Sequence, residues 1–147
     1  MAYASQTDIE TIYGAQALYI ADRDGDGVAD VAAVTRALDA ASDEIDTYLT
    51  VRYALPLASV PAVLGQLAVD IALYRLAASH DVLTEELRRR YEDAVAHLRR
   101  IARGEAGLPM PAVTDPETGE SFGDGRPQPI VAGGPPRLFS REKMRGL

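Results

Sequence analysis

One stretch of the sequence constrains the fold more than any other. Residues 62–78 read AVLGQLAVDIALYRLAA, and only Gln66, Asp70 and Arg75 among them are strongly polar. A helix that is apolar on nearly every side has to be covered on nearly every side. Pro61 suits the first helical position, and the uninterrupted apolar runs are far shorter than the ~20 residues of a membrane span. We therefore expect a central helix buried inside a protein rather than in a membrane.

Two amphipathic segments flank this helix and are the candidates for its cover. Residues 31–53 repeat apolar side chains at three- and four-residue steps, and residues 84–103 do the same up to Gly104. Thr84 is the predicted N-cap of the second segment. Short connections between consecutive helices favour antiparallel neighbours. Residues 1–104 are therefore predicted to form an all-α domain, a small bundle of about four helices.

A shorter helix is predicted at the start of the chain. Ser5 can cap it, Asp8 stands at the capping-box position, and Gly14 is a plausible stop. Ion pairs at four-residue spacing are expected on the outer face of the last helix, joining Glu85 to Arg89 and Glu86 to Arg90. Buried carboxylates are normally paired, so Asp70 is expected to pair with Arg75, Arg52 or a neighbouring subunit.

The sequence DRDGDGVAD, residues 22–30, is the only stretch that looks like a chemical motif. Its aspartates fall at positions one, three, five and nine of a calcium-binding loop, and Gly27 falls at position six, where the turn is sharp. Position twelve, however, is Ala33 instead of a bidentate glutamate. Two interpretations stand: a polar turn in which Asp30 caps the next helix, or a structural calcium site. The candidate metal ligands are Asp22, Asp24, Asp26 and Asp30.

Catalysis has little support in this sequence. The chain has no cysteine and two histidines, His80 and His97, which fit no metal or nucleophile spacing. There is no phosphate loop and no nucleophile elbow. The N-terminal residues lack the basic start and apolar run of a secretory signal. We expect a non-enzymatic protein without a cofactor, the calcium alternative aside, and an intracellular site of synthesis.

The composition changes beyond Gly104. Seven of the nine prolines lie in residues 105–147, together with many glycines, and such a segment buries too little apolar surface to order itself. We predict a long extended arm, with at most a small hairpin over residues 114–124. The arm ends in PPRLFSREKMRGL, where apolar residues stand among cations. The predicted partner-binding residues are Arg137, Leu138, Phe139, Arg141, Met144 and Leu147.

The charge is distributed unevenly along the chain. The net charge is −7, with +4 in residues 126–147 and therefore −11 in the first 125 residues. An acidic body argues against broad binding to nucleic acid. A basic end suggests docking on an acidic surface, for example that of another copy. Arginines between Arg88 and Arg103 form a basic cluster, which is interpreted as a solvated helix face, with DNA contact as the alternative.

The ordered combination of these pieces resembles a known family. The pieces are YASQTDIETIYG, DRDGDGVAD, the stretch from RALDAAS through YLTVRYALPL and the central helix, and the terminal PPRLFSREKMRGL. Together they are similar to the small Mu-like phage proteins of the morphogenetic gene cluster near the capsid genes. That family is regarded as head–tail joining, head-completion or adaptor proteins. The resemblance covers essentially the whole chain.

The resemblance implies a helical bundle that works as a virion structural protein at the head–tail interface. Such adaptors form a homo-oligomeric ring, typically dodecameric, below the portal protein, with an arm that reaches the portal or a neighbouring subunit. The implied partners are the portal, the next head–tail joining or tail-terminator protein, and DNA only as it passes through the channel; no membrane is involved. The alternative from the residues alone is a calcium-binding helical regulatory or interaction module that uses residues 22–30.

Overall fold

The computed structural model describes residues 2–110, 113–114 and 121–122. These residues form α1, η1 (a 3₁₀-helix), α2, α3, α4 and two short strands, β1 and β2. The predicted all-α class is confirmed. The bounds are Gln6–Tyr13 for α1, Ala15–Ala21 for η1, Val31–Leu49 for α2, Ala62–Ser79 for α3, Glu85–Arg103 for α4, Val113–Thr114 for β1 and Ser121–Phe122 for β2.

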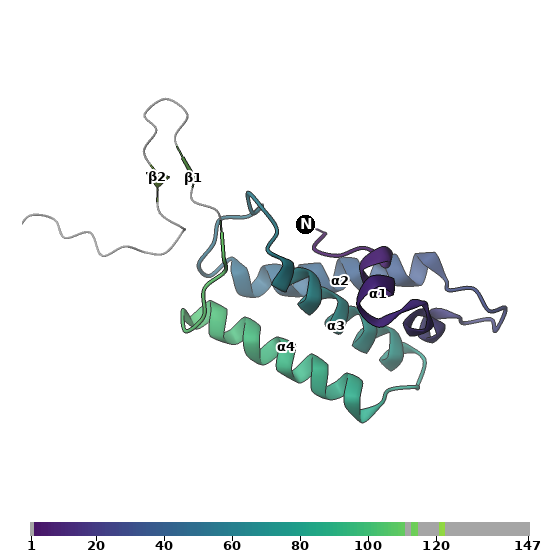
Figure 1. Ribbon diagram of the computed structural model, residues 1–147. Helices are drawn as coiled ribbons and strands as arrows, with labels where there is room; N and C mark the ends of the chain where they lie inside the picture. Colours follow the sequence, from purple (N-terminus) through teal and green to yellow (C-terminus); the bar gives the residue numbers. More distant parts are fainter. Residues whose placement is uncertain (1, 111–112, 115–120, 123–147) are drawn as a thin grey trace, which may run out of the picture. The chain divides into compact units, whose positions relative to one another are not determined.

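The chain divides after Pro111 into two compact units, which we call the helical unit and the C-terminal unit. In the helical unit, α3 packs against both α2 and α4, while α1 and η1 lie across α3 (Figure 1). Helices α2, α3 and α4 alternate in direction, so α2 and α4 start at the same end (Figure 1). The core is aliphatic, and its largest fully buried side chains are Ile9, Val34, Ile45, Leu49, Leu64, Val69, Ile71, Leu73, Leu98 and Ile101.

The central position of α3 agrees with its sequence. Among the described helices, α3 alone is long and apolar enough to cross a membrane by length and composition. More than half of its residues are nevertheless buried inside the helical unit. This burial is typical of a core helix, because a helix that is apolar on all sides gains from cover on all sides.

The helix ends follow the predicted signals. The Ser5 N–H and hydroxyl donate to the Asp8 carboxylate at the start of α1, and this lowers the pKa of Asp8. Thr84 accepts from the Leu87 N–H at the start of α4, and Gly104 ends that helix in the left-handed conformation. Pro61 lies one position before α3 rather than inside it.

Helix α2 is shorter than the predicted 31–53. It ends at Leu49, whose carbonyl accepts from the N–H groups of Arg52 and Tyr53 in a turn. The Tyr53 hydroxyl in turn accepts from the Leu108 N–H at 3.1 Å, and Leu108 is buried. The first residues after Gly104 therefore pack on the helical unit.

In the C-terminal unit, β1 and β2 pair antiparallel, with Val113 opposite Phe122 and Thr114 opposite Ser121. This pairing agrees with a small hairpin in that stretch. The predicted partner-binding residues lie outside the described residues, so the extended arm and its binding peptide remain predictions. Those residues are Arg137, Leu138, Phe139, Arg141, Met144 and Leu147.

The partner of Asp70 differs from the prediction. Its carboxylate accepts from the Tyr13 hydroxyl and from the Gln66 amide, not from an arginine. Arg75 is turned away and pairs with Glu44 at 2.7 Å. The reason is tertiary: α1 packs against α3 and brings a tyrosine hydroxyl within reach of the Asp70 carboxylate.

Of the two ion pairs predicted on α4, one is confirmed and the other is wrong. Arg90 pairs with Glu86 as expected, and its guanidinium also lies 4.5 Å from the centre of the Tyr13 ring. Glu85, however, pairs with Arg88 rather than Arg89. Spacings of three and four residues both bring helix side chains together, and here the shorter spacing forms the bond. Arg88 also reaches Glu92, four residues further on.

Candidate interaction site at the aspartate loop

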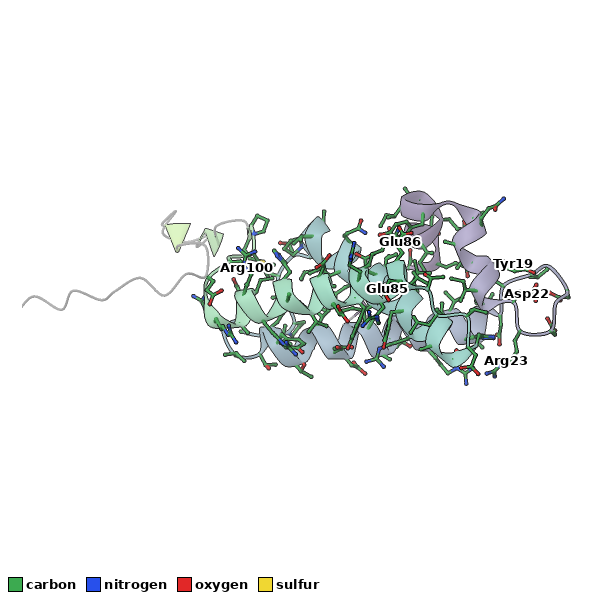
Figure 2. All side chains as sticks on the ribbon, turned by 90° about the horizontal axis from the view of Figure 1, so that it is seen from below. Tyr19, Asp22, Arg23, Glu85, Glu86 and Arg100 are labelled. Carbon is green, nitrogen blue, oxygen red and sulfur yellow. The ribbon has the colours of Figure 1, made fainter. Side chains whose placement is uncertain are left out.

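The aspartate loop, residues 22–30, joins η1 to α2 at one end of the helical unit. Figure 2 shows Tyr19, Asp22 and Arg23 together at this end and Arg100 near the other. The Asp30 N–H donates to the Ala21 carbonyl at 3.0 Å and closes the base of the loop. The loop therefore projects from a fixed base between two helical elements.

Asp22 organises the inside of the loop. Its two carboxylate oxygens accept from the N–H groups of Gly25 at 2.8 Å, Asp26 at 3.2 Å and Gly27 at 2.9 Å. Gly25 and Gly27 have φ of 74° and 84°. Glycine adopts this left-handed region without steric cost. Short polar residues and glycine thus give the turn its form through local hydrogen bonds.

The structure brings together three of the four candidate metal ligands. One carboxylate oxygen from each of Asp22, Asp24 and Asp26 lies within 4.8 Å of the others. Asp30 does not join them, because its carboxylate accepts from the N–H groups of Ala32 and Ala33 as the N-cap of α2. The capping role was one of the two interpretations of the sequence. Carboxylate oxygens are ligands that a hard cation such as calcium prefers, but calcium takes about six to eight of them. Both oxygens of Asp22 also already accept hydrogen bonds.

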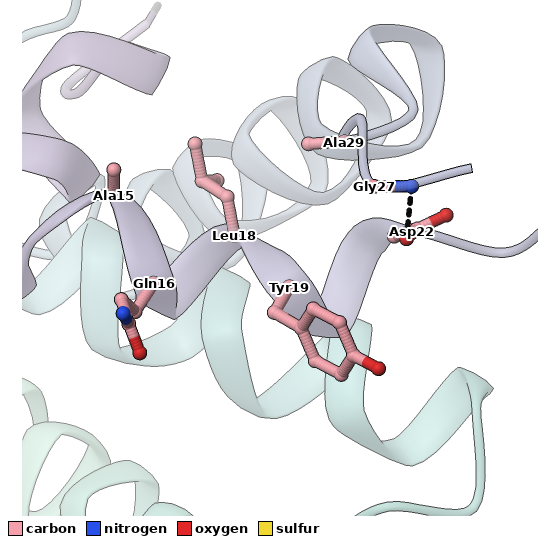
Figure 3. Close-up of a pocket in the computed structure, with 7 residues that line it drawn as sticks. All are labelled: Ala15, Gln16, Leu18, Tyr19, Asp22, Gly27 and Ala29. Carbon is pink, nitrogen blue, oxygen red and sulfur yellow. Dashed lines mark hydrogen bonds between the residues drawn. The ribbon is translucent and has the colours of Figure 1, made fainter. Parts of the chain in front are cut away.

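A hollow of about 370 Å³ lies between η1 and the loop (Figure 3). Its lining is mainly small or apolar and consists of Ala15, Gln16, Leu18, Tyr19, Asp22, Gly27 and Ala29. A second hollow of about 320 Å³ shares Ala29 with it and is lined otherwise by Arg23, Asp24, Asp26, Val28 and Asp30. The loop therefore carries carboxylates and contributes to the lining of two adjacent hollows.

Large apolar side chains are exposed around these hollows. Tyr19 is 78% exposed, Val28 64% and Val31 60%. Single exposed apolar residues are normal, but several beside a cavity mark an interaction surface. Sequence reasoning missed this surface because it assigned no helix to residues 15–21, which are short for the helix that enters a calcium loop. The available signal was Tyr19 and Val28 on either side of an acidic turn.

Two tyrosines outside this site hold the helices together. Burial, and then the hydrogen bond to Asp70, raise the pKa of Tyr13 to about 12. Burial, and then the hydrogen bond to Glu44, raise the pKa of Tyr91. The Tyr91 ring also stacks on Tyr74 at 4.1 Å between centroids. These contacts lie between helices and stabilise the protonated tyrosines, so we interpret them as structural.

Comparison with known proteins identifies the relationship. Residues 3–123 match the family described as "Bacteriophage Mu, Gp36". The chain belongs to this family. It is 32% identical to "Gene product J" of Escherichia phage Mu over 151 aligned positions, which cover 100% of this chain and 99% of that protein.

A second relative of the Gp36 family comes from a prophage. The chain is 42% identical over 92 residues to "Mu-like prophage FluMu protein gp36" of Haemophilus influenzae. That match covers 63% of this chain and 62% of the relative, so the chain spans under two thirds of the Haemophilus protein's length. Both relatives are phage or prophage proteins by name, and the predicted resemblance to Mu-like phage proteins is confirmed.

Proposed function

We propose that this phage protein is a virion structural subunit of the head–tail connector. In this role it forms a homo-oligomeric ring below the portal, joins the capsid to the tail and leaves a channel for DNA. The observation that carries the proposal is the Gp36 family match over residues 3–123, combined with the resemblance to adaptor proteins. The role is mechanical rather than catalytic.

The charge distribution supports this role. A ring built from bodies with a net charge of −11 over the first 125 residues repels the phosphate backbone, so DNA slides past without adhering. Many copies of one modest interface, closed by rotational symmetry, give a stable assembly from small subunits. The helical unit supplies a compact body for such an interface, because its core is a single hydrophobic cluster.

A gene deletion in the phage or prophage that carries this protein tests the proposal. We expect particles to stop at filled heads and separate tails, both visible by electron microscopy, and plasmid expression of the full chain to restore joined particles. The protein itself should be present in purified virions. Normal joining without the protein, or its absence from virions, contradicts the proposal.

Complementation with a variant that lacks residues 133–147 sharpens this test. We expect the variant to keep the circular-dichroism spectrum of the full chain, since the described core ends before that segment. It should nevertheless fail to restore joined particles. Restoration equal to that by the full chain would show that the basic peptide has no part in assembly.

A structural calcium ion at the aspartate loop is the second candidate. The approach of three carboxylates within 4.8 Å favours it. The incomplete ligand set opposes it, since Asp30 caps α2 and position twelve is Ala33. Calorimetric titration with calcium after chelator treatment tests whether the loop binds the ion. A site that binds calcium releases or absorbs heat and raises the melting temperature, whereas no heat at millimolar calcium removes this candidate.

A further inference from the structure

The aspartate-loop end of the helical unit offers both apolar contact area and negative charge. Tyr19 and Val28 are 78% and 64% exposed beside the two hollows that meet at Ala29. Residues 22–30 contain four aspartates and one arginine, a net charge of −3. Asp24 and Asp26 are exposed. We call this surface, formed by Tyr19 and residues 22–31, the acceptor surface.

The other end of the chain has the complementary chemistry. Residues 135–147 carry three arginines, one lysine and one glutamate, a net charge of +3. Apolar residues stand between the cations, and they are Leu138, Phe139, Met144 and Leu147. Complementary charge steers two surfaces together and fixes their register, while apolar anchors in hollows supply affinity. This peptide matches the acceptor surface in both respects.

Another hollow on the helical unit fits the peptide less well. It has a volume of about 420 Å³ and lies beside Ile12 and Val60, each 39% exposed. The acidic residue in its lining is Asp8, and the Asp8 carboxylate already accepts two hydrogen bonds from Ser5. The residues beside this hollow are therefore less exposed, and its lining holds one carboxylate, whereas the acceptor surface holds four.

The peptide leaves the helical unit at the end opposite the acceptor surface, and in the proposed ring this arrangement suits a second copy as the donor. Residues after α4 pack beside the C-terminal end of α2, where Leu108 bonds to Tyr53. The acceptor surface lies at the N-terminal end of α2, and 19 helical residues separate the two ends by about 28 Å. A peptide that leaves one end and binds the opposite end of the next copy makes a head-to-tail contact. Contacts of this type close into rings when the rotation permits.

We infer that residues 135–147 of one copy dock on the acceptor surface of a second copy, with the cations facing Asp24 and Asp26 and the apolar residues in the hollows beside Tyr19. This inference rests on the proposed ring and specifies a contact between its neighbouring subunits. Residues 112–134 span at most about 80 Å when extended, so they can bridge adjacent subunits.

Cross-linking between single cysteines tests the contact on the full chain, which has no cysteine of its own. A Val28→Cys variant is mixed with an equal amount of a tagged Ser140→Cys variant and treated with a short bifunctional maleimide. The main product should be the mixed dimer, which the tag identifies. Val51→Cys is the matched control, because Val51 is 67% exposed and lies beyond the C-terminal end of α2. We expect at least ten-fold less mixed dimer with the control.

A charge exchange tests the recognition itself. Asp24→Lys with Asp26→Lys in the Val28→Cys chain, or Arg137→Glu with Arg141→Glu in the Ser140→Cys chain, should lower the mixed dimer about ten-fold. Combining both changes should restore it to within about three-fold, because the reversed charges again attract. Asp22 is kept, since it holds the loop, and circular dichroism verifies that each variant is folded.

Several outcomes overturn the inference. These are a mixed-dimer yield equal to that of the Val51→Cys control, stronger cross-linking to an Ile12→Cys chain, or a yield unaffected by the charge changes. A chain that carries both Val28→Cys and Ser140→Cys should form intermolecular products; an internal cross-link in monomers would show docking on the same copy. Failure here with unjoined heads and tails in the deletion phage would overturn this contact but leave the connector role intact.

Discussion

Helix α3 and the aspartate-loop end differ in how far their side chains are buried and paired within the chain. The polar residues of α3 find partners inside the chain, with Asp70 bound to Tyr13 and Gln66 and Arg75 bound to Glu44. Among the described residues, no buried side-chain polar atom lacks a hydrogen-bond partner. At the loop end, the backbone satisfies Asp22 while Tyr19 stays 78% exposed. The polar groups of the core are thus paired within the helical unit, whereas the loop end leaves large apolar side chains exposed to solvent.

The largest effect is expected from a charge in the middle of α3. Ile71 is fully buried, and Ile71→Asp places an unpaired carboxylate among apolar neighbours. Such a change costs at least about 4 kcal/mol, which is comparable to the stability of a small domain. We expect loss of the helical circular-dichroism signal at 25 °C. Ile71→Val is the control and should cost about 1 kcal/mol. A native spectrum and unchanged melting temperature for Ile71→Asp would show that α3 is not central to the core.

Alkaline pH should weaken the same core. Tyr3, Tyr13 and Tyr91 have pKa values raised by burial and by hydrogen bonds to Asp46, Asp70 and Glu44, with that of Tyr13 at about 12. A raised pKa stabilises the fold below the unfolded-state value near 10, and this stabilisation is lost as the pH rises from 10 towards 12. Urea unfolding should therefore give a constant stability from pH 8 to 9 and a falling one above 10. Constant stability up to pH 12 would contradict these assignments.

Removing one hydroxyl should have an intermediate effect. Tyr13→Phe keeps the ring under Arg90 but deprives Asp70 of its tyrosine partner. Asp70 is half-buried and keeps Gln66 as a partner, so the loss should lie near the lower end of the about 1–3 kcal/mol for a buried acceptor without its partner. Urea unfolding at pH 7 measures it. The loss of stability above pH 10 should also be smaller in this variant. Thr7→Ala on the exposed side of α1 is the control and should change stability by less than about 0.5 kcal/mol.

The N-cap of α2 should contribute less. Asp30→Ala removes the acceptor for the N–H groups of Ala32 and Ala33, which costs about 1 kcal/mol. Asp30→Ser keeps a capping oxygen and should recover most of that stability. If calcium raises the melting temperature of the parent but not of either variant, Asp30 is a metal ligand as well as a cap.

The sequence predicted many features of the fold that depend on neighbouring residues, although it missed the end of α2 and the partner of Glu85. The caps at Thr84 and Asp30, the stop at Gly104 and the burial of residues 62–78 all follow from local hydrogen bonding and helical periodicity. Features that join distant residues were missed. Nothing near Asp70 in the sequence indicates Tyr13 as its partner, because the contact exists only once α1 lies on α3.

In the candidate site, too, local features were predicted and those that depend on the fold were not. The turn and its carboxylates were readable from the spacing of aspartate and glycine in residues 22–30. The hollow beside Leu18 and Tyr19 was not, because it forms only where η1 and the loop meet in space. The sequence left two roles open for Asp30, a helix cap or a metal ligand. In the structure α2 starts at the next residue, and Asp30 is its N-cap.

The smallest effect on stability, and the sharpest contrast with α3, is expected at Tyr19. Tyr19→Ser removes a ring that is 78% exposed, so the free energy of unfolding should change by less than about 0.5 kcal/mol. Association between copies should fall all the same if the ring is an anchor for a neighbour, because aromatic residues dominate the energy of interfaces. Sedimentation velocity at several protein concentrations measures this on the same samples as urea unfolding. A large loss of stability would place Tyr19 in the core, and unchanged association together with unchanged stability would remove it from the acceptor surface.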